Sequence, residues 1–415
     1  MEYKVSENVS TALKAVTADA KVQEALQFME DDQENIIQKQ IELTLIPAPT
    51  FHEEKKAARL MEMFREEGLD DVHIDEYGNV VGVRKGTGGG KNVLLEGHMD
   101  TVFALDTPLE IRRENGWIFC PGITDDTRGC AAVLSTLRGL NKAGITTKGD
   151  IHFVGTVQEE GMGALRGMQY YVQHHPELDA SISVDGAGFQ AITYEATGIQ
   201  TYEFNFYGKG GHAYGAFGEV ANPLHAAGRA IAKIAEIQVP DYPKTTFAVT
   251  GAYAGSYSAI HAIVNKATIT LNFRSNSQEE LMKLKEKIFA CMDEAVKEET
   301  ERWGKDTITY DFQHFMDVNA GTQDSHASIV EGAMAIAEFL GCEEPKLGHG
   351  GSTNCSRALE GGLPAVCLGD GADWESLCHT VEERFCEKDA FKGAQAAMLL
   401  ALLCAGTEMA DSVVE

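Results

Sequence analysis

Positive charge is scarce in this sequence. Its 415 residues include 35 Lys and Arg against 63 Asp and Glu, which gives a formal net charge of −28 at pH 7. Such a charge repels a phosphate backbone, so we expect no nucleic-acid partner. The excess of carboxylates favours divalent cations, although it is also typical of a solvated surface.

Long apolar runs and paired cysteines are missing as well. No stretch reaches the ~20 apolar residues that span a bilayer, and residues 1–16 are polar and acidic, without the apolar centre of a signal peptide. The nine cysteines are scattered and include no Cys-x-x-Cys pair. We expect reduced, mostly buried thiols, and therefore a cytoplasmic protein without a membrane partner.

A phosphate-binding loop is absent too, despite the glycine-rich run at residues 86–91. Its lysine is not followed by Ser or Thr, and the next pattern, at residues 93–95, is that of a strand and not of a helix. We therefore predict a hairpin turn at this run.

The hydrophobic pattern predicts an α/β fold that is interrupted once. The spacing of residues 1–46 predicts one helix. Strands then alternate with helices as far as residue 184, which is typical of a mostly parallel sheet. Between residues 201 and 312 the expected order becomes β-α-β-β-α-β, the ferredoxin-like arrangement. We predict an α/β domain over residues 1–195 and 317–415, with a ferredoxin-like α+β domain over residues 196–316 inserted into it.

His98 and Asp100 form the most informative local pattern. They end an apolar run and are two residues apart, so in an extended chain both side chains point to the same face. One imidazole can then bind a metal while the carboxylate orients its other nitrogen. Taken alone, the pattern is more typical of a solvated strand end.

Four further positions strengthen the metal interpretation, although each has an ordinary explanation by itself. Asp125 precedes an expected helix, as an N-cap does; Glu159 and Glu160 follow an apolar strand, as in a solvated turn. Together the ligand-type residues supply two imidazoles and three carboxylates, which suit zinc without any thiolate. The set is His98, Asp125, Glu160, Asp185 and His379. A carboxylate shared by two metals holds them ~3.5–4 Å apart, and Glu159 is then the expected general base.

The motifs around these positions resemble a known family. They are the segments at residues 97–100 and 122–125, the Glu159-Glu160 pair, Asp185 and His379. The chain is similar, from about residue 41 onward, to the co-catalytic zinc metallopeptidases that include glutamate carboxypeptidase, aminoacylase, succinyl-diaminopimelate desuccinylase and peptidase T. The resemblance implies a zinc-exopeptidase-like catalytic domain, an inserted lid and dimerisation domain, and two Zn²⁺ per chain, for which Co²⁺ or Mn²⁺ can substitute.

The resemblance also implies a role for each matching residue. His98 and Asp185 would hold one zinc, Glu160 and His379 the other, and Asp125 would bridge them. Asp100 would support His98, and Glu159 would activate the attacking water. A non-proline cis peptide between Asp125 and Asp126 is implied as well.

Two segments depart from the family pattern. Asp126-Thr127-Arg128 stands where many members carry a lysine and a glycine, which affects the contacts expected for this loop. Residues 350–354 resemble the family's substrate loop, with an Asn where Asp is common. The predicted substrate contacts in this loop are Gly351, Ser352, Thr353 and Asn354.

Two residues of the inserted domain match substrate-contacting positions of the family. His212 lies in a segment whose histidine polarises the scissile carbonyl, often across a dimer interface; the alternative is a plain surface histidine. Strand alternation places Arg274 on a polar face that is either solvent or the cleft. The resemblance implies that Arg274 binds a substrate carboxylate, which suits a planar guanidinium.

The sequence therefore predicts a dizinc hydrolase of amide or peptide bonds in small substrates with a free carboxylate, of exopeptidase, di/tripeptidase or carboxypeptidase type. An N-acyl-amino-acid amidohydrolase remains an alternative, and a non-catalytic metal- or peptide-binding protein on the same fold is a second one. A mere binder needs neither Asp100 nor Glu159, so their presence favours an enzyme. We also expect the inserted domain to close over the site and to form a homodimer.

Overall fold

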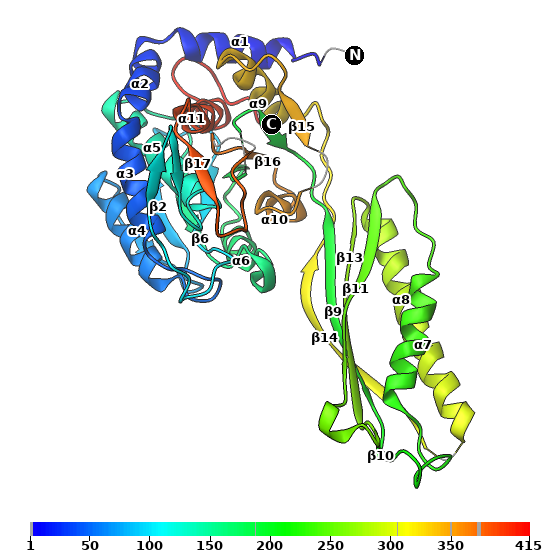
Figure 1. Ribbon diagram of the computed structural model, residues 1–415. Helices are drawn as coiled ribbons and strands as arrows, with labels where there is room; N and C mark the ends of the chain where they lie inside the picture. Colours follow the sequence, from blue (N-terminus) through cyan, green and yellow to red (C-terminus); the bar gives the residue numbers. More distant parts are fainter. Residues whose placement is uncertain (1–2, 187, 305, 349–350, 372–374) are drawn as a thin grey trace. The chain divides into compact units, whose positions relative to one another are not determined.

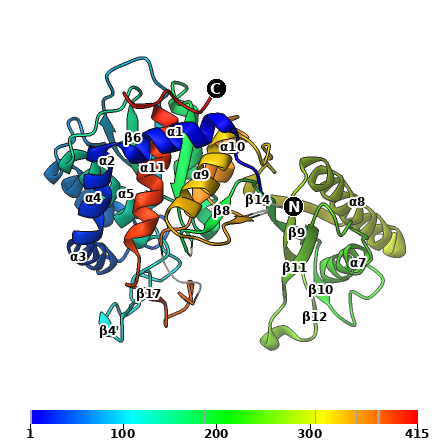
Figure 2. The ribbon, with the colours of Figure 1, turned by 90° about the horizontal axis from the view of Figure 1, so that it is seen from above.

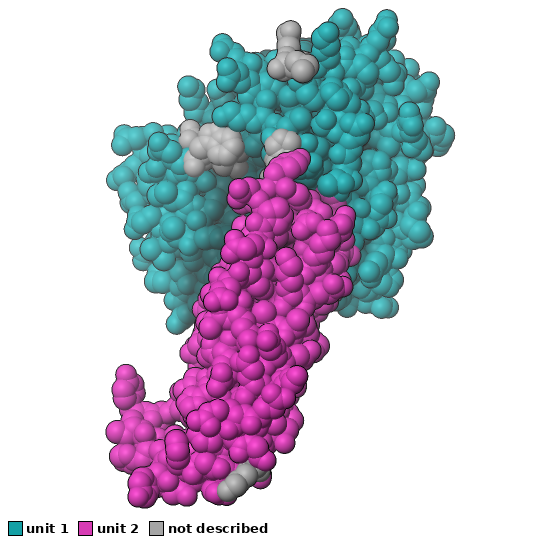
Figure 3. All heavy atoms as spheres, turned by 90° about the vertical axis from the view of Figure 1, so that its right-hand side faces the viewer, with its two compact units in different colours: residues 1–196, 322–415 teal, residues 197–321 magenta. Residues whose placement is uncertain are grey.

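The computed structural model describes residues 3–186, 188–304, 306–348, 351–371 and 375–415. The chain forms two compact units, coloured separately in Figure 3: unit 1 comprises residues 1–196 and 322–415, and unit 2 comprises residues 197–321. Unit 2 extends past the expected boundary at residue 316, because its last strand stays paired with its neighbour as far as Val318.

Unit 1 is built on an eight-stranded sheet with the strand order β1-β2-β6-β3-β7-β16-β8-β15. The four central strands β6, β3, β7 and β16 are mutually parallel. The sheet comprises β1 (His73–Ile74), β2 (Val80–Arg84), β3 (Val93–His98), β6 (Ile151–Thr156), β7 (Ala180–Val184), β8 (Ala191–Thr193), β15 (Lys346–Gly348) and β16 (Ala365–Leu368). A smaller sheet contains β4 (Arg112–Glu114), β5 (Trp117–Phe119) and β17 (Arg384–Cys386).

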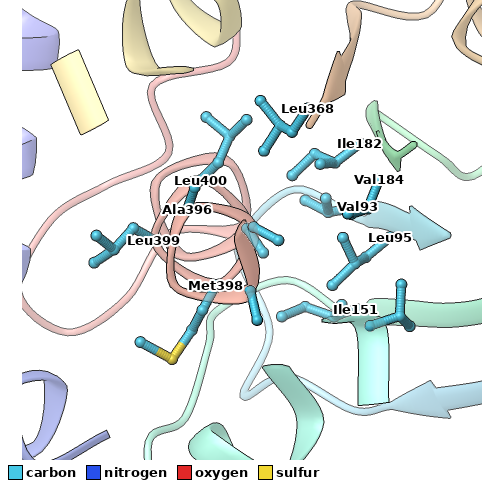
Figure 4. Packing of buried hydrophobic residues seen from close by; sticks show 14 of the residues in the cluster. Val93, Leu95, Ile151, Ile182, Val184, Leu368, Ala396, Met398, Leu399 and Leu400 are labelled. Atoms are coloured by element: carbon cyan, nitrogen blue, oxygen red, sulfur yellow. The ribbon is translucent and has the colours of Figure 1, made fainter. Parts of the chain in front are cut away.

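Helices cover both faces of the large sheet, as its unbroken apolar strands require. The helices of unit 1 are α1 (Glu7–Ala18), α2 (Ala20–Asp31), α3 (Gln33–Thr44), α4 (Glu54–Glu66), α5 (Thr127–Lys142), α6 (Arg166–His174), α9 (Ser328–Phe339), α10 (Cys355–Glu360) and α11 (Phe391–Ala405). Val93 and Leu95 of β3 belong to the core that includes α5 and α11, and Leu94 between them belongs to the core that includes α6 and α10. Figure 4 shows α11 beside side chains of the central strands, and Figure 2 shows it next to α5 and α9.

Two expectations about unit 1 are wrong. The run at residues 86–91 is not a hairpin turn, because β6 lies between β2 and β3, antiparallel to the first and parallel to the second. The run instead packs against the loop before β6, where Gly88 N donates to Lys148 O at 2.8 Å. Residues 1–46 form three helices and not one, and the first break comes at Asp19, whose carboxylate caps α2.

Unit 2 has the predicted ferredoxin-like order. Its four-stranded antiparallel sheet runs β11-β13-β9-β14, and α7 and α8 lie along one face of it (Figure 1). Ile269, Leu271 and Phe273 are fully buried in this core, and Arg274 is exposed, as the alternation predicts. The elements are β9 (Gly198–Tyr207), α7 (Pro223–Ala235), β11 (Thr245–Ala254), β13 (Lys266–Ser275), α8 (Gln278–Trp303) and β14 (Thr309–Val318), with a small pair β10 (Gly211–His212) and β12 (Ala262–Ile263).

All nine cysteines are free. Within the described ranges, no helix combines the length and the apolar character that crossing a membrane requires.

Candidate metal centre

Three of the predicted ligands lie where parallel strands end. His98 is the last residue of β3, Glu159 and Glu160 follow β6, and Asp185 follows β7. Because β6 and β7 flank β3 in the sheet, their carboxyl ends meet at one edge. This is the edge at which open α/β sheets place their ligand sites.

The loop before α5 contributes the fourth ligand and also the cap of that helix. Asp126 is the N-cap: its Oδ1 accepts from Gly129 N at 2.9 Å, and its Oδ2 accepts from His98 N at 2.9 Å. The ordinary explanation considered for Asp125 therefore applies to its neighbour. The predicted cis peptide between Asp125 and Asp126 is confirmed.

Asp125 presents one carboxylate oxygen to each of two imidazoles. Its Oδ1 lies 3.2 Å from His98 Nε2, and its Oδ2 lies 2.9 Å from His379 Nε2. His379 Nε2 is also 2.9 Å from Glu160 Oε1. A carboxylate that faces two different donor groups in this way is arranged as a bridging ligand is.

The remaining donors complete two overlapping groups. One nitrogen or oxygen atom from each of His98, Asp125 and Glu160 lies within 4.8 Å of the others, and the same holds for His98, Glu159 and Asp185. All five predicted ligands and Glu159 are thus brought together in unit 1. The nitrogen and oxygen donor set matches the preferences of zinc.

The ionisation of these groups shows an excess of negative charge. Burial and the neighbouring Asp125 carboxylate raise the pKa of Asp185 to about 7, and burial raises the pKa of Glu159 well above its usual value. The hydrogen bond with Asp125 raises the pKa of His379 to about 9. A multivalent cation offsets the repulsion between buried carboxylates, so the donor set fits a metal pair.

Asp100 organises the loop that carries the acidic pair. Its buried carboxylate accepts from Glu159 N and Glu160 N, both at 3.0 Å, and from Thr50 Oγ1 at 2.9 Å. His98 Nδ1 is 3.1 Å from the backbone oxygen of Asp100 and 3.5 Å from its Oδ1. Asp100 therefore contacts His98 chiefly through its carbonyl and positions Glu159 and Glu160 through its carboxylate.

Two buried acids that the sequence analysis missed hold the backbone around the centre. Glu383 accepts from three amides of the Asp125 loop, at 2.8 to 3.1 Å, and Glu53 accepts from Gln158 N at 3.0 Å. Glu383 stands four residues after His379, so its place in that motif was a usable signal. Glu53 precedes α4 and offers no comparable signal.

Arg128, part of the segment that departs from the family pattern, has a structural role. Its buried guanidinium donates to Asp370 O at 3.1 Å and to Ala390 O at 2.5 Å, and it lies over the Phe385 ring at 5.1 Å. The side chain therefore joins α5 to the loop after β16 and to the start of α11.

The expected substrate loop is anchored through its last residue. Asn354 is 2% exposed, and its Nδ2 donates to Glu96 Oε2 and to Thr156 Oγ1, both at 2.8 Å. Its side chain therefore fixes the loop to β3 and β6 and does not reach the surface. Gly351, Ser352 and Thr353 are half-buried, and Gly350 lies outside the described residues.

Asn354→Asp should destabilise unit 1 by about 1–3 kcal/mol, because it removes two donated hydrogen bonds and sets a carboxylate against Glu96. Thermal unfolding at pH 8 measures the change. The double variant Glu96→Gln with Asn354→Asp restores a donor opposite an acceptor and should recover much of the loss. Equal unfolding temperatures for the parent and Asn354→Asp would contradict the anchoring role.

The two predicted residues of unit 2 are both exposed. His212 Nδ1 accepts from Tyr214 N and Gly215 N, each at 3.2 Å. Because Nδ1 acts as an acceptor in these contacts, Nε2 carries the ring proton and is a donor. Arg274 Nε donates to Asn272 Oδ1 at 3.1 Å on the polar face of β13.

Solved peptidase structures have a similar fold. The aminopeptidase PepT from Bacillus cereus matches with a TM-score of 0.73 and 21% identity, over 89% of this chain and 97% of that chain. The di-peptidase Dug1p from Saccharomyces cerevisiae matches with a TM-score of 0.70 and 13% identity, over 91% and 98% of the two chains.

Curated relatives and a family model extend the comparison. Carboxypeptidase G2 from Pseudomonas sp. is 33% identical over 138 residues, 32% of this chain and 33% of the relative. Succinyl-diaminopimelate desuccinylase from Leptothrix cholodnii is 25% identical over 255 residues, 57% and 65% of the two chains. The chain thus covers less than two thirds of either relative's length. The model of peptidase family M20/M25/M40 matches residues 94–403, and the chain belongs to this family.

Proposed function

We propose that this protein is a metal-dependent hydrolase of amide bonds in small substrates that carry a free carboxylate. The observation that carries the proposal is the Asp125 carboxylate, which faces both His98 and His379. The Glu159 carboxylate lies beside the His98 imidazole. Family membership supports hydrolysis of a peptide or related amide bond.

The donor set supports two divalent cations, and we propose zinc. His98 and Asp185 would hold one, Glu160 and His379 the other, and Asp125 would bridge them. A structure from Bacillus subtilis with a TM-score of 0.66 and 16% identity is described as a dinuclear metal-binding peptidase, in keeping with this proposal. Bound cations of this kind polarise a carbonyl and activate water for attack.

Glu159 is the proposed general base and acid. Its carboxylate lies 3.9 Å from His98 Nε2. Its backbone N–H donates to the Asp100 carboxylate, which holds the residue in place. It would take a proton from the attacking water and deliver that proton to the leaving amine. His212 Nε2–H would donate to the carbonyl oxygen as charge develops there, and Arg274 would bind the substrate carboxylate.

The choice between peptidase and deacylase is the finer part of the proposal. One relative is named a carboxypeptidase and another a desuccinylase, so the names of the relatives do not decide between a peptidase and an N-acyl-amino-acid amidohydrolase. We propose the exopeptidase as the main activity. Cytoplasmic localisation and a homodimer through unit 2 also remain predictions.

A panel of paired substrates tests the proposal. Dipeptides, N-acetyl amino acids and their C-terminal amides would be incubated with the zinc-loaded chain, and amine release measured. We expect cleavage of the dipeptides and at least a ~10-fold loss when the terminal carboxylate becomes an amide. Preferred cleavage of the acetyl compounds would assign a deacylase, and no cleavage of any member would contradict hydrolysis.

Mixing two inactive variants tests the proposed role of His212 and the dimer together. If His212 serves the partner's site, dimers of Glu159→Gln with His212→Ala contain one site with both groups intact. Roughly a quarter of the parent activity should then return after subunit exchange. No recovery despite verified exchange would place His212 in its own chain's site or outside catalysis, and a fully active monomer would rule out the dimer requirement.

A further inference from the structure

A second cluster of metal-binding side chains lies at the other end of β6. His152 is the second residue of this strand, whereas Glu159 and Glu160 come after its last residue. The four steps from His152 to Thr156 alone span about 13 Å of extended chain, so the cluster is separate from the candidate metal centre. Its members are His152, His175 and Glu177.

The three side chains offer donor atoms that converge. One nitrogen of each imidazole and one oxygen of Glu177 lie within 4.8 Å of one another. The imidazole centroids are 5.7 Å apart with an interplanar angle of 85°, and His175 Nδ1 is 2.8 Å from Glu177 Oε1. Two imidazoles and a carboxylate form a common zinc ligand set, which also suits Cu²⁺ and Ni²⁺.

His152 is held ready for a metal by its surroundings. It is 4% exposed and faces α6, where the Tyr171 hydroxyl lies 2.8 Å from its Nδ1. Such a contact fixes the ring, as hydrogen-bonding partners do for metal-ligating histidines.

The other two members leave the cluster open to solvent. His175 caps the C-terminus of α6, and its ring stacks on Tyr171 with centroids 4.1 Å apart. The side chains of His175 and Glu177 are 30% and 47% exposed. A hydrated cation can therefore reach the cluster from outside and keep water at its remaining positions.

An ordinary ion pair accounts for only part of this arrangement. His175 and Glu177 would form such a pair at the helix end without any help from β6. The convergence of a buried imidazole from a different element on that pair adds a third ligand. The Glu177 carboxylate also supplies the negative charge that a divalent cation needs.

We propose that His152, His175 and Glu177 form an additional site for a divalent transition metal, with zinc as the reference ion. The bound cation joins the C-terminal end of α6 to β6. The segment that carries Glu159 and Glu160 connects the end of β6 to the start of α6. The proposed site would link the opposite ends of these two elements, the start of β6 and the end of α6. The proposal does not depend on the proposed function.

Zinc counting by equilibrium dialysis tests the site. His175→Ala should bind about one Zn²⁺ per chain fewer than the parent, whatever the count at the other centre. Glu177→Gln, which keeps the shape of the side chain, should weaken this one zinc at least ~10-fold. The matched control is His174→Ala, since His174 is the neighbouring exposed histidine and stacks on Tyr170 outside the cluster.

Electron paramagnetic resonance with Cu²⁺ gives a readout that does not involve activity. In the Asp125→Ala background, the electron spin of one bound Cu²⁺ should couple to the nitrogen nuclei of two imidazoles. Adding His175→Ala should reduce the number of coupled imidazoles to one. Equal zinc counts in the parent, His175→Ala and Glu177→Gln would overturn the proposal. Coupling to a single nitrogen in the Asp125→Ala background would also overturn it, because His152 would then not be a ligand.

Discussion

Glu159→Gln should lower kcat at least ~10²–10⁴-fold and leave metal binding close to that of the parent. The amide has the shape of the carboxylate and keeps the backbone contact with Asp100, but it cannot take a proton from water. Single-turnover kinetics and metal analysis on the same preparation measure the two effects separately.

The matched control for this variant is Glu382→Gln. Glu382 is an acid near His379 whose side chain is 71% exposed, so its neutralisation should leave kcat within about twofold. A Glu159→Gln enzyme with near-parent turnover would refute the assignment of the general base. Loss of metal together with turnover would make Glu159 a ligand and not the base.

Asp125→Ala should remove both cations of the centre and, with them, measurable activity. Its two oxygens face His98 and His379, so the substitution takes a donor from each half of the centre at once. Metal analysis under zinc excess should give a difference of about two cations per chain between the parent and the variant.

Folding must be checked in this variant, because Asp125 lies beside the cap of α5. Asp126→Asn is the comparison, since it alters the cap and its contact with His98 N while Asp125 stays in place. We expect Asp126→Asn to lower the stability of the chain while it keeps most of its bound metal. An Asp125→Ala chain that keeps both cations would rule out the bridging role.

The convergence of several predicted ligands could be expected because strand ends are visible in the sequence, while their roles as metal ligands remain predictions. Parallel strands finish at one edge of a sheet, so residues that directly follow apolar runs, such as His98 and Asp185, meet there. The alternation in β13 likewise separated its buried residues from Arg274. The meeting of strand ends and the alternation in β13 follow from local periodicity, whereas the roles of the individual ligands are implied by the family resemblance.

Contacts between distant segments could not be predicted in this way. Glu383 accepts hydrogen bonds from backbone amides of the Asp125 loop, about 260 residues away in the chain. Its place four residues after His379 marks it as part of that motif, but no local pattern shows which backbone groups it contacts. Asn354 matched a substrate loop by resemblance, yet its burial gives it an anchoring role. The run at residues 86–91 has the composition of a hairpin, but the insertion of β6 between β2 and β3 is a property of the whole sheet.

The three N-terminal helices were predictable in part. Asp19 separates α1 from α2 and accepts from Lys21 N and Val22 N, a capping signal that was present in the sequence. The helical periodicity continues across the breaks, so it conceals them.

Removal and return of divalent cations on one preparation tests the central claim most directly. The chain would be treated with a chelator, dialysed, and assayed on the dipeptide and N-acetyl panel before and after Zn²⁺ or Co²⁺ is restored. We predict no amine release by the metal-free chain and full recovery of amine release when the metal is restored. The Asp125→Ala variant should show no recovery. Equal hydrolysis by the metal-free chain, or no hydrolysis of any substrate after metal is restored, would contradict a metal-dependent amide hydrolase.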